Sequence, residues 1–161
     1  MIVRPVLSSD AAELAELLNA IIARGGTTAL QTPYTAEALD SAYLTGPKVI
    51  CCFVAVDSET GQLLGFQTLG RLDALPADIG DIGTFTRVDG IQRGVGSALF
   101  AATKARAREL GLTALNAVIR ADNVGGLTFY TRQGFIDHDI VRDVPLSDGT
   151  RVDRVWKRYP L

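Results

Sequence analysis

The spacing of apolar residues changes between a helical and an extended period along the chain. Apolar positions between Leu14 and Ile22 recur at intervals of three and four residues, which predicts a helix. Asp10 and Glu13 stand at the spacing of a capping box, so this helix is expected to begin beside Asp10 and to end at Gly25-Gly26. The run from Val49 to Val56 is apolar throughout and predicts a buried strand.

The same patterns divide the rest of the chain into strands and helices. Further helices are expected over 35–44, 94–110 and 123–132, and strands at 2–7, 48–56, 62–71, 79–87, 113–119, 135–142 and 151–158. This order favours the α/β class in its mixed α+β form, a mixed sheet with helices on its faces. The sequence contains no internal repeat, linker or low-complexity tract, so residues 1–161 are interpreted as one domain.

Composition indicates a globular protein and argues against several classes of partner. Hydrophobic residues make up 47% and charged residues 21%, as in ordinary soluble domains. No apolar run reaches the roughly 18 residues that a membrane-spanning helix needs, and the first residues lack the features of a signal peptide. A cytoplasmic location without a membrane partner is therefore expected. The net charge of −2 argues against a nucleic-acid partner.

Charge is unevenly spread along this acidic chain. Between Arg87 and Arg132, seven basic side chains stand against three acidic ones, which makes the segment +4 and the remainder −6. A local surplus of positive charge suits a small polyanionic ligand. A solvated helix face accounts for Lys104, Arg106 and Arg108 equally well.

The two cysteines are neighbours in the predicted strand over 48–56. Consecutive side chains of a strand point to opposite faces, so Cys51 and Cys52 are not expected to form a disulfide with each other. The sequence has no Cys-x-x-Cys spacing and no histidine cluster, so no metal cofactor is expected.

The most informative stretch lies just before and at the start of the helix over 94–110. It reads Gln92-Arg93-Gly94-Val95-Gly96-Ser97. Glycine lets the backbone approach a ligand closely, and the unpaired amide groups of a first helical turn attract an anion. A dinucleotide fingerprint needs a third glycine where Leu99 stands, and the Gly-Lys-Ser/Thr sequence of a P-loop is absent. The stretch predicts a phosphate site of another kind, although such glycines also occur simply to make the turn.

Residues 91–96 resemble the acyl-CoA motif Gln/Arg-x-x-Gly-x-Gly/Ala of the GNAT superfamily of N-acetyltransferases. Both glycine positions match, whereas Ile91 replaces the usual Gln or Arg and Gln92 stands next to it. The resemblance covers nearly the whole chain in element order, and it extends to individual residues over about 84–135. It implies that the CoA pyrophosphate binds at Gln92, Arg93, Gly94, Val95, Gly96 and Ser97.

Residues 123–135 resemble the second motif of the same family, Asn-x-x-Ala-x-x-Leu/Phe-Tyr-x-x-x-Gly-Phe, with Gly126 where alanine is common. The resemblance implies that Asn123 touches the pantetheine arm of CoA. It also implies that Tyr130 lies beside the sulfur, where it protonates or hydrogen-bonds the departing thiolate. Each residue has a structural alternative, since Asn123 can cap a helix and Tyr130 can be a core aromatic residue.

Further site residues follow from their position relative to the family. The resemblance implies that the central strand offers backbone groups to pantetheine and to the thioester oxygen at Phe85, Thr86 and Arg87. The general base is sought at Asp81, in preference to Asp78, although either carboxylate can equally be solvated.

The loop between the first two helices is where family members shape the acceptor pocket. It contains Thr27, Thr28 and Gln31, which can hydrogen-bond a polar substrate or can simply stabilise the turn. The acidic remainder of the chain favours a cationic acceptor by electrostatic steering alone.

The resemblance implies the GNAT fold, a central mixed and mostly antiparallel sheet of about seven strands, with helices on both faces and a splay between strands 4 and 5. It implies an enzyme that moves an acetyl group from acetyl-CoA, its co-substrate, to the primary amine of a small molecule or peptide by direct attack. The alternative is a catalytically inactive acyl-CoA-binding regulatory module, which Ile91 and the lack of an obvious base keep open. A homodimer is a further expectation, since many relatives pair through late strands.

Overall fold

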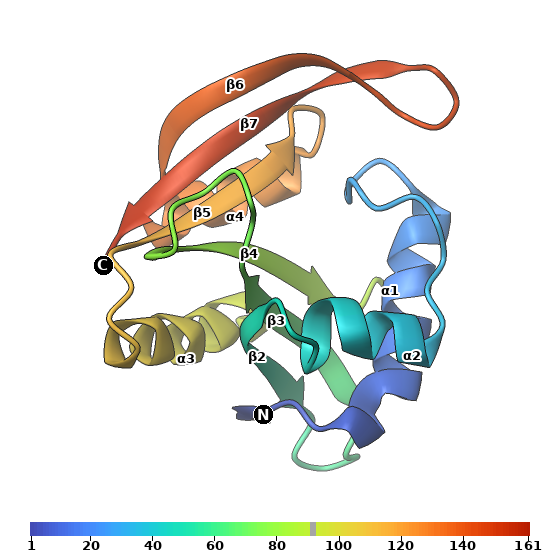
Figure 1. Ribbon diagram of the computed structural model, residues 1–161. Helices are drawn as coiled ribbons and strands as arrows, with labels where there is room; N and C mark the ends of the chain where they lie inside the picture. Colours follow the sequence, from blue (N-terminus) through green and yellow to red (C-terminus); the bar gives the residue numbers. More distant parts are fainter. Residues whose placement is uncertain (91–92) are drawn as a thin grey trace.

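A mixed seven-stranded sheet organises the chain, and helices cover both of its faces (Figure 1). The computed structural model describes residues 1–90 and 93–161. The strands, in the spatial order β1-β2-β3-β4-β5-β7-β6, are β1 (Ile2–Pro5), β2 (Val49–Val56), β3 (Leu63–Gly70), β4 (Ile79–Thr86), β5 (Ala114–Arg120), β6 (Ile136–Pro145) and β7 (Arg151–Pro160). The helices are α1 (Ala11–Arg24), α2 (Ala36–Leu39), α3 (Val95–Glu109) and α4 (Val124–Gln133), with the 3₁₀-helix η1 (Ser8–Asp10) before α1 and the π-helix η2 (Asp40–Leu44) after α2.

The strands β4 and β5 form the one parallel pair of the described sheet, and they separate soon after they begin. Their register joins Ile79–Asp81 to Ala114–Asn116. The remaining pairs are antiparallel. Beyond the paired ends the two strands diverge, so β5, β7 and β6 form a second arm of the sheet (Figure 1). The expected mixed sheet, mostly antiparallel and splayed between its fourth and fifth strands, is confirmed.

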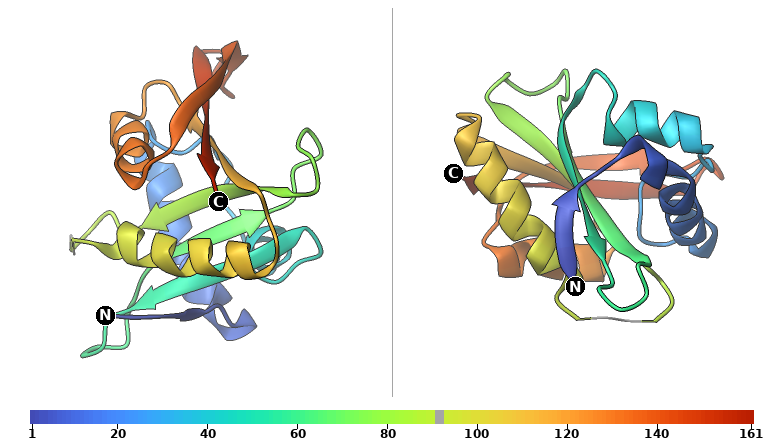
Figure 2. Two further views of the ribbon diagram at one scale, coloured as in Figure 1. Left: turned by 90° about the vertical axis from the view of Figure 1, so that its left-hand side faces the viewer. Right: turned by 90° about the horizontal axis from the view of Figure 1, so that it is seen from below.

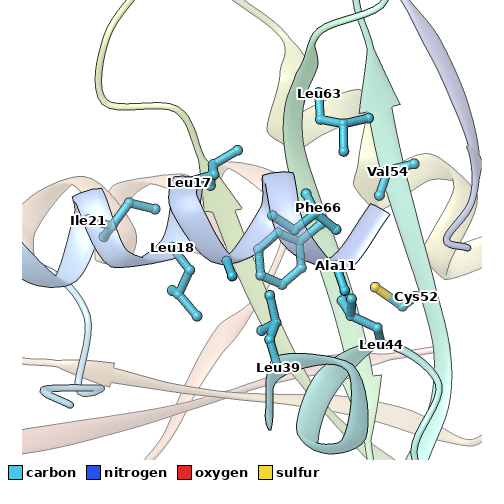
Figure 3. Packing of buried hydrophobic residues seen from close by; sticks show 12 residues of the cluster. Ala11, Leu17, Leu18, Ile21, Leu39, Leu44, Cys52, Val54, Leu63 and Phe66 are labelled. Atoms are coloured by element: carbon cyan, nitrogen blue, oxygen red, sulfur yellow. The ribbon is translucent and has the colours of Figure 1, made fainter. Parts of the chain in front are cut away.

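One face of the first four strands packs against α1 and α2. The helical spacing of the apolar residues of α1 puts Leu17, Leu18 and Ile21 on the side that meets Phe66 and Leu39 (Figure 3). Cys52 belongs to this cluster, whereas Cys51 packs against the core on the opposite face. Both cysteines are free, as the alternation along β2 predicted.

The opposite face packs against α3, with α4 beside it. Figure 2 shows α3 on one side of the sheet and the α1–α2 pair on the other. Buried positions recur about once per helical turn along α3, and Ala105, which falls between two of them, is exposed. The buried residues of α3 are Val95, Leu99, Phe100, Thr103 and Ala107.

The start of α1 differs from the expected capping box. The carboxylate of Asp10 accepts hydrogen bonds from Arg4 at 2.8 and 2.9 Å and from the Leu7 amide at 2.8 Å, so it caps η1 rather than α1. The bond from Arg4 lowers the pKa of Asp10. Glu13 reaches away from the helix end and accepts from the Leu63 amide at 2.7 Å. Both carboxylates therefore attach α1 to the sheet. Across residues 1–90 and 93–161, no helix combines the length and apolar character needed to cross a membrane.

Candidate functional site

The turn before α3 has the geometry of an anion site. Gly94 is the N-cap residue of α3 and has φ +83°, a left-handed conformation that glycine adopts at low cost. No side chain among the described residues caps the first turn of α3, so its amide groups are available at the positive end of the helix dipole. Gln92, to which a pyrophosphate contact was assigned, lies outside the described residues together with Ile91. Arg93 is exposed beside the turn.

The second glycine of the turn lets α3 approach α4. A Cβ atom on Gly96 would lie 2.7 Å from Cε1 of Phe129, which is closer than side chains pack. Nearby, Gln133 of α4 donates a hydrogen bond to Oγ of Ser97 at 2.9 Å. The two sequence motifs, separated by some 30 residues, therefore meet at this helix contact.

Tyr130 is a buried residue of α4, and its hydroxyl has a polar partner on β4. Its oxygen is 2.9 Å from Oγ1 of Thr84, and Thr84 also accepts a hydrogen bond from Nε2 of Gln67 at 2.9 Å. Burial raises the pKa of Tyr130, so the phenol keeps its proton at neutral pH. Because Thr84 has a hydroxyl hydrogen of its own to donate, Tyr130 can accept it and turn its own proton elsewhere.

Asn123 is the N-cap residue of α4. Its side-chain oxygen accepts a hydrogen bond from the Gly126 amide at 2.9 Å, which is the structural alternative considered for this residue. A Cβ on Gly126 would lie 2.5 Å from Nδ2 of Asn123, so the glycine at this position makes room for the cap. The Nδ2 group of Asn123 has no recorded acceptor among the described residues and is the part left for a ligand.

Asp81 is the partly buried carboxylate of β4, at the closed end of the splay. It accepts a hydrogen bond from Asn116 of β5 at 2.9 Å, and Asn116 in turn accepts one from Arg158 of β7 at 2.8 Å. Burial raises the pKa of Asp81 to about 6, although the bond from Asn116 opposes this shift. Asp81 shares the face of Phe85, the face of α1 and α2, whereas Thr84 and Tyr130 lie on the other face. Asp78, the other candidate base, is exposed and accepts from Thr113 at 2.8 Å.

The end of β4 directs backbone groups into the splay. The amide of Arg87 bonds to the carbonyl of Leu64 on β3, and ladder bonds alternate along an antiparallel pair, so the groups of Thr84 and Thr86 point toward the β5 side. The side chain of Phe85 stacks on Phe66. Of the three residues assigned to cofactor binding here, Thr86 directs its backbone groups into the splay, whereas those of Phe85 and Arg87 are directed toward β3.

The side chain of Arg87 has a structural partner. It donates to Glu13 of α1 at 2.9 Å and to the Leu63 carbonyl. Its amide also bonds to the Leu64 carbonyl, so a contact from Arg87 to a cofactor would have to displace one of these bonds. A hollow of about 330 Å³ adjoins it, lined by Glu16, Leu17, Ala20, Arg87, Val88 and Asp89.

Comparison with known families agrees with this geometry. The model described as the acetyltransferase (GNAT) family matches residues 23–135, which is more than half of the chain. The chain belongs to the GNAT acetyltransferase family. The match includes the glycine turn, β4, and the whole second motif.

Solved structures show the same fold at low sequence identity. A ribosomal-protein-alanine N-acetyltransferase from Brucella melitensis is 18% identical with TM-score 0.84, and each chain is covered in full. A GNAT phosphinothricin acetyltransferase from Sinorhizobium meliloti, in complex with acetyl-CoA, is 18% identical with TM-score 0.83, covering 99% of this chain and 88% of that one. YncA from Salmonella typhimurium, described as a putative acetyltransferase with its cofactor acetyl-CoA, is 17% identical with TM-score 0.82, covering 100% and 94%. No curated protein sequence matches the chain.

The loop that precedes α2 in this GNAT acetyltransferase lies against the second arm of the sheet. The carbonyl of Thr28 accepts a hydrogen bond from Arg120 of β5 at 3.2 Å. Gln31 accepts from the amide of Ser147 at 2.7 Å and also from its hydroxyl, at the tip of the β6–β7 hairpin. Thr27 is exposed. Thr28 and Gln31, two of the three residues predicted to line the acceptor pocket, thus attach the loop to β5 and to the β6–β7 hairpin.

Several polar residues around the splay had not been singled out from the sequence. Gln67 donates to Thr84, and Thr84 in turn contacts Tyr130. Tyr43 of η2 contacts Tyr34 through its hydroxyl at 3.5 Å. Burial raises the pKa of Tyr43, with Asp81 adding to the shift. Gln67 in particular interrupts the apolar strand β3, and a buried polar residue in such a strand is a signal that sequence reasoning can use.

Proposed function

We propose that this GNAT acetyltransferase moves the acetyl group of acetyl-CoA to a primary amine by direct attack in a ternary complex. The observation that carries the proposal is the position of the Tyr130 hydroxyl, beside Thr84 on the strand that leads to the glycine turn. The complexes of the Sinorhizobium meliloti and Salmonella typhimurium proteins with acetyl-CoA support the choice of donor.

Each residue then has a specific task in the transfer. The amides at the start of α3 bind the pyrophosphate, and the backbone of Thr84 and Thr86 faces the pantetheine and the thioester oxygen. The amine nitrogen attacks the carbonyl carbon, the carbon–sulfur bond breaks, and Tyr130 gives its proton to the thiolate, whose intrinsic pKa is near ~8.5. Asp81, directly or through water, accepts the proton that the amine loses.

A thioester intermediate on a cysteine receives no support from the site. Cys52 is buried in the cluster under α1, and Cys51 is on the opposite face, with burial raising the pKa of Cys51 to about 11. A thiol with such a pKa is mostly protonated at neutral pH and is a poor nucleophile. Direct attack is therefore the route proposed.

The test combines calorimetry with a thiol-release assay over a panel of amines. Tyr130→Phe is expected to lower kcat about tenfold or more, because general acid catalysis contributes factors of this size, while acetyl-CoA affinity stays within about threefold. The matched control is Tyr159→Phe, which removes a hydroxyl from the same aromatic cluster without a recorded hydrogen bond among the described residues. An unchanged kcat in Tyr130→Phe removes this residue from the mechanism. Binding of acetyl-CoA without transfer to any amine favours the alternative, a catalytically inactive acyl-CoA-binding regulatory module.

A further inference from the structure

Two buried arginines oppose each other across β5 and β7. Arg120 and Arg154 are cross-strand partners, and they are 7% and 8% exposed. Like charges directly opposite each other destabilise a strand pair, and burial adds the cost of removing each guanidinium from water. More than one negatively charged group is therefore needed to balance the charge of this arginine pair.

Arg120 already holds a carboxylate. It donates two hydrogen bonds to Asp122, at 2.9 and 2.7 Å, and a third to the Thr28 carbonyl. This bidentate pair shows how the site accommodates one carboxylate. Asp148, on the hairpin turn, contributes a weaker attraction to Arg120.

Arg154 has donors to spare. Its recorded hydrogen bond runs from Nη1 to the Val152 carbonyl at 3.2 Å, and within residues 1–90 and 93–161 it takes part in no ion pair. A guanidinium has five N–H groups. No nitrogen of Arg154 is among the side-chain atoms of the described residues that are both inaccessible to solvent and without a hydrogen-bond partner. The remaining donors therefore reach solvent. Burial, followed by repulsion from Arg120, lowers the pKa of Arg154, and the attraction of Asp122 opposes this shift. An arginine remains charged at physiological pH.

The arginine pair lies on the acceptor side of the sheet. Asn116, Val118 and Arg120 share one face of β5, because Leu115, Ala117 and Ile119 belong to the core under α3 and α4. On β7 the same face carries Arg158, which bonds to Asn116, and Arg154. Asn116 bonds in turn to Asp81, so the pair stands on the same face as the candidate base.

The register also sets Arg120 level with the last residues of β4. Asp81 is paired with Asn116, and four residues further along each strand are Phe85 and Arg120. These two residues therefore stand at equal height on opposite sides of the splay. The acceptor loop closes the far side through its bonds from Thr28 to Arg120 and from Gln31 to Ser147.

We infer that Arg154, with Arg120 beside it, binds a carboxylate carried by the acceptor amine. The substrate class is an amine with its own carboxylate, as in an amino acid or a peptide with an acidic residue near its free amine. The inference rests on the proposed function, since it specifies the acceptor of that same site. The acidic residues elsewhere in the chain act on an approaching ligand only over long distances, where salt screens their charge. The two guanidinium groups contact the ligand directly, so they determine which charge the site binds.

The test compares each of several amino acids with its own carboxamide as acceptor, with rates referred to the neutral fraction of each amine. The wild-type protein is expected to favour the carboxylate form roughly tenfold or more in kcat/KM, chiefly through KM, as charge-assisted hydrogen bonds imply. Arg154→Gln is expected to remove most of that preference, and Arg154→Lys to retain part of it. Arg151→Gln, an exposed arginine on the same strand, is the matched control and should keep the full preference.

Calorimetric titration of the same compounds into the protein with CoA separates this inference from the proposed function. Arg154-dependent binding of carboxylate amines without any acetyl transfer supports the anion site and counts against the proposed function. Acetyl transfer with equal preference for acids and carboxamides, or a preference that survives in Arg154→Gln, overturns the anion site and leaves the proposed function standing. If the protein shows no binding of these amines and no acetyl transfer, both the anion site and the proposed function are overturned.

Discussion

Thr84 links Gln67 of β3 to Tyr130 of α4, so two strands position the phenol that we assign to the leaving thiolate. The Oε1 atom of Gln67 is buried without a partner among the described residues. A buried amide oxygen without a partner costs free energy, while the Nε2 group of the same amide orients the Thr84 hydroxyl. Gln67 therefore helps to set the position of the Tyr130 hydroxyl at some cost in folding stability.

Thr84→Val is expected to lower kcat and to cost about 1–3 kcal/mol of unfolding free energy, because Gln67 and Tyr130 both lose their partner. Thr84→Ser keeps the hydroxyl and should restore kcat, even where packing of the lost methyl group costs some stability. Steady-state kinetics and urea unfolding provide the two measurements. Equal kcat values for the valine and serine variants would show that the hydroxyl does not position Tyr130.

Because the pKa of Asp81 is raised, we expect both the rate of acetyl transfer and the free energy of unfolding to depend on pH. With its pKa raised to about 6 from 3.8, the folded protein binds this proton more tightly than the unfolded chain does. Its contribution to stability is therefore complete below pH about 4 and is lost as the pH rises through about 6. A base must be ionised, so the rate should show an added fall below pH about 6.

Asp81→Asn is expected to abolish that added fall in kcat/KM and to raise stability at pH 8 by up to about 3 kcal/mol, since no charge remains to be buried. Asp78→Asn is the matched control at an exposed carboxylate and should leave the pH profile unchanged. The profile and the urea midpoint at pH 5 and pH 8 give the two readouts. If the wild-type profile has no such limb, Asp81 is not the base.

At the scale of elements, the contact between α3 and α4 depends on the absence of one side chain. The sequence motifs identified both helices and both glycines of the turn, because glycine at a helix start has a local physical reason. They could not reveal that Gly96 faces the ring of Phe129, since that contact depends on how two separate helices pack. The buried face of α3 likewise has no clear local signal, because small alanine residues mark no distinct apolar stripe.

Gly96→Ala is expected to destabilise the fold by about 1–3 kcal/mol, since a Cβ there meets Phe129 at 2.7 Å and the helices must move apart. Acetyl-CoA affinity should fall with it, because Gly96 belongs to the first turn of α3. Gly125→Ala is the control, with its nearest neighbour at 3.8 Å, and is expected to be neutral or to stabilise α4 by up to about 1 kcal/mol. Thermal unfolding and calorimetry measure both. Equal loss of stability in the two variants contradicts the packing argument.

At the scale of the molecule, the sheet has two arms that are joined at one end and bridged at the other. The pairs of β4 with β5 form the joint, and the bonds of Thr28 with Arg120 and of Gln31 with Ser147 form the bridge. The splay followed from the family resemblance. The bridge, the Arg87–Glu13 pair and the Arg120–Arg154 pair could not be predicted, because each joins residues distant in sequence and neither partner carries a local pattern.

Gln31→Ala is expected to release the hairpin tip from the acceptor loop. Hydrogen exchange should then become faster at the amide of Ser147 and in the loop around Gln31, while global stability changes by less than about 1 kcal/mol because the contact is exposed. Gln62→Ala, an exposed glutamine in the β2–β3 turn, is the control. Unchanged exchange at Ser147 would mean that the bridge does not hold the hairpin.

The separation of β4 from β5 leaves the backbone groups of Thr84 and Thr86 without a neighbouring strand. A pantetheine arm carries two amides of its own, so once inserted it would act as a short substitute strand and complete the ladder at that point. Part of the binding energy would then be energy of sheet formation. Acetyl-CoA should accordingly raise the melting temperature in proportion to the logarithm of its concentration, and the largest gain in exchange protection should fall at the edge of β4, away from the pyrophosphate.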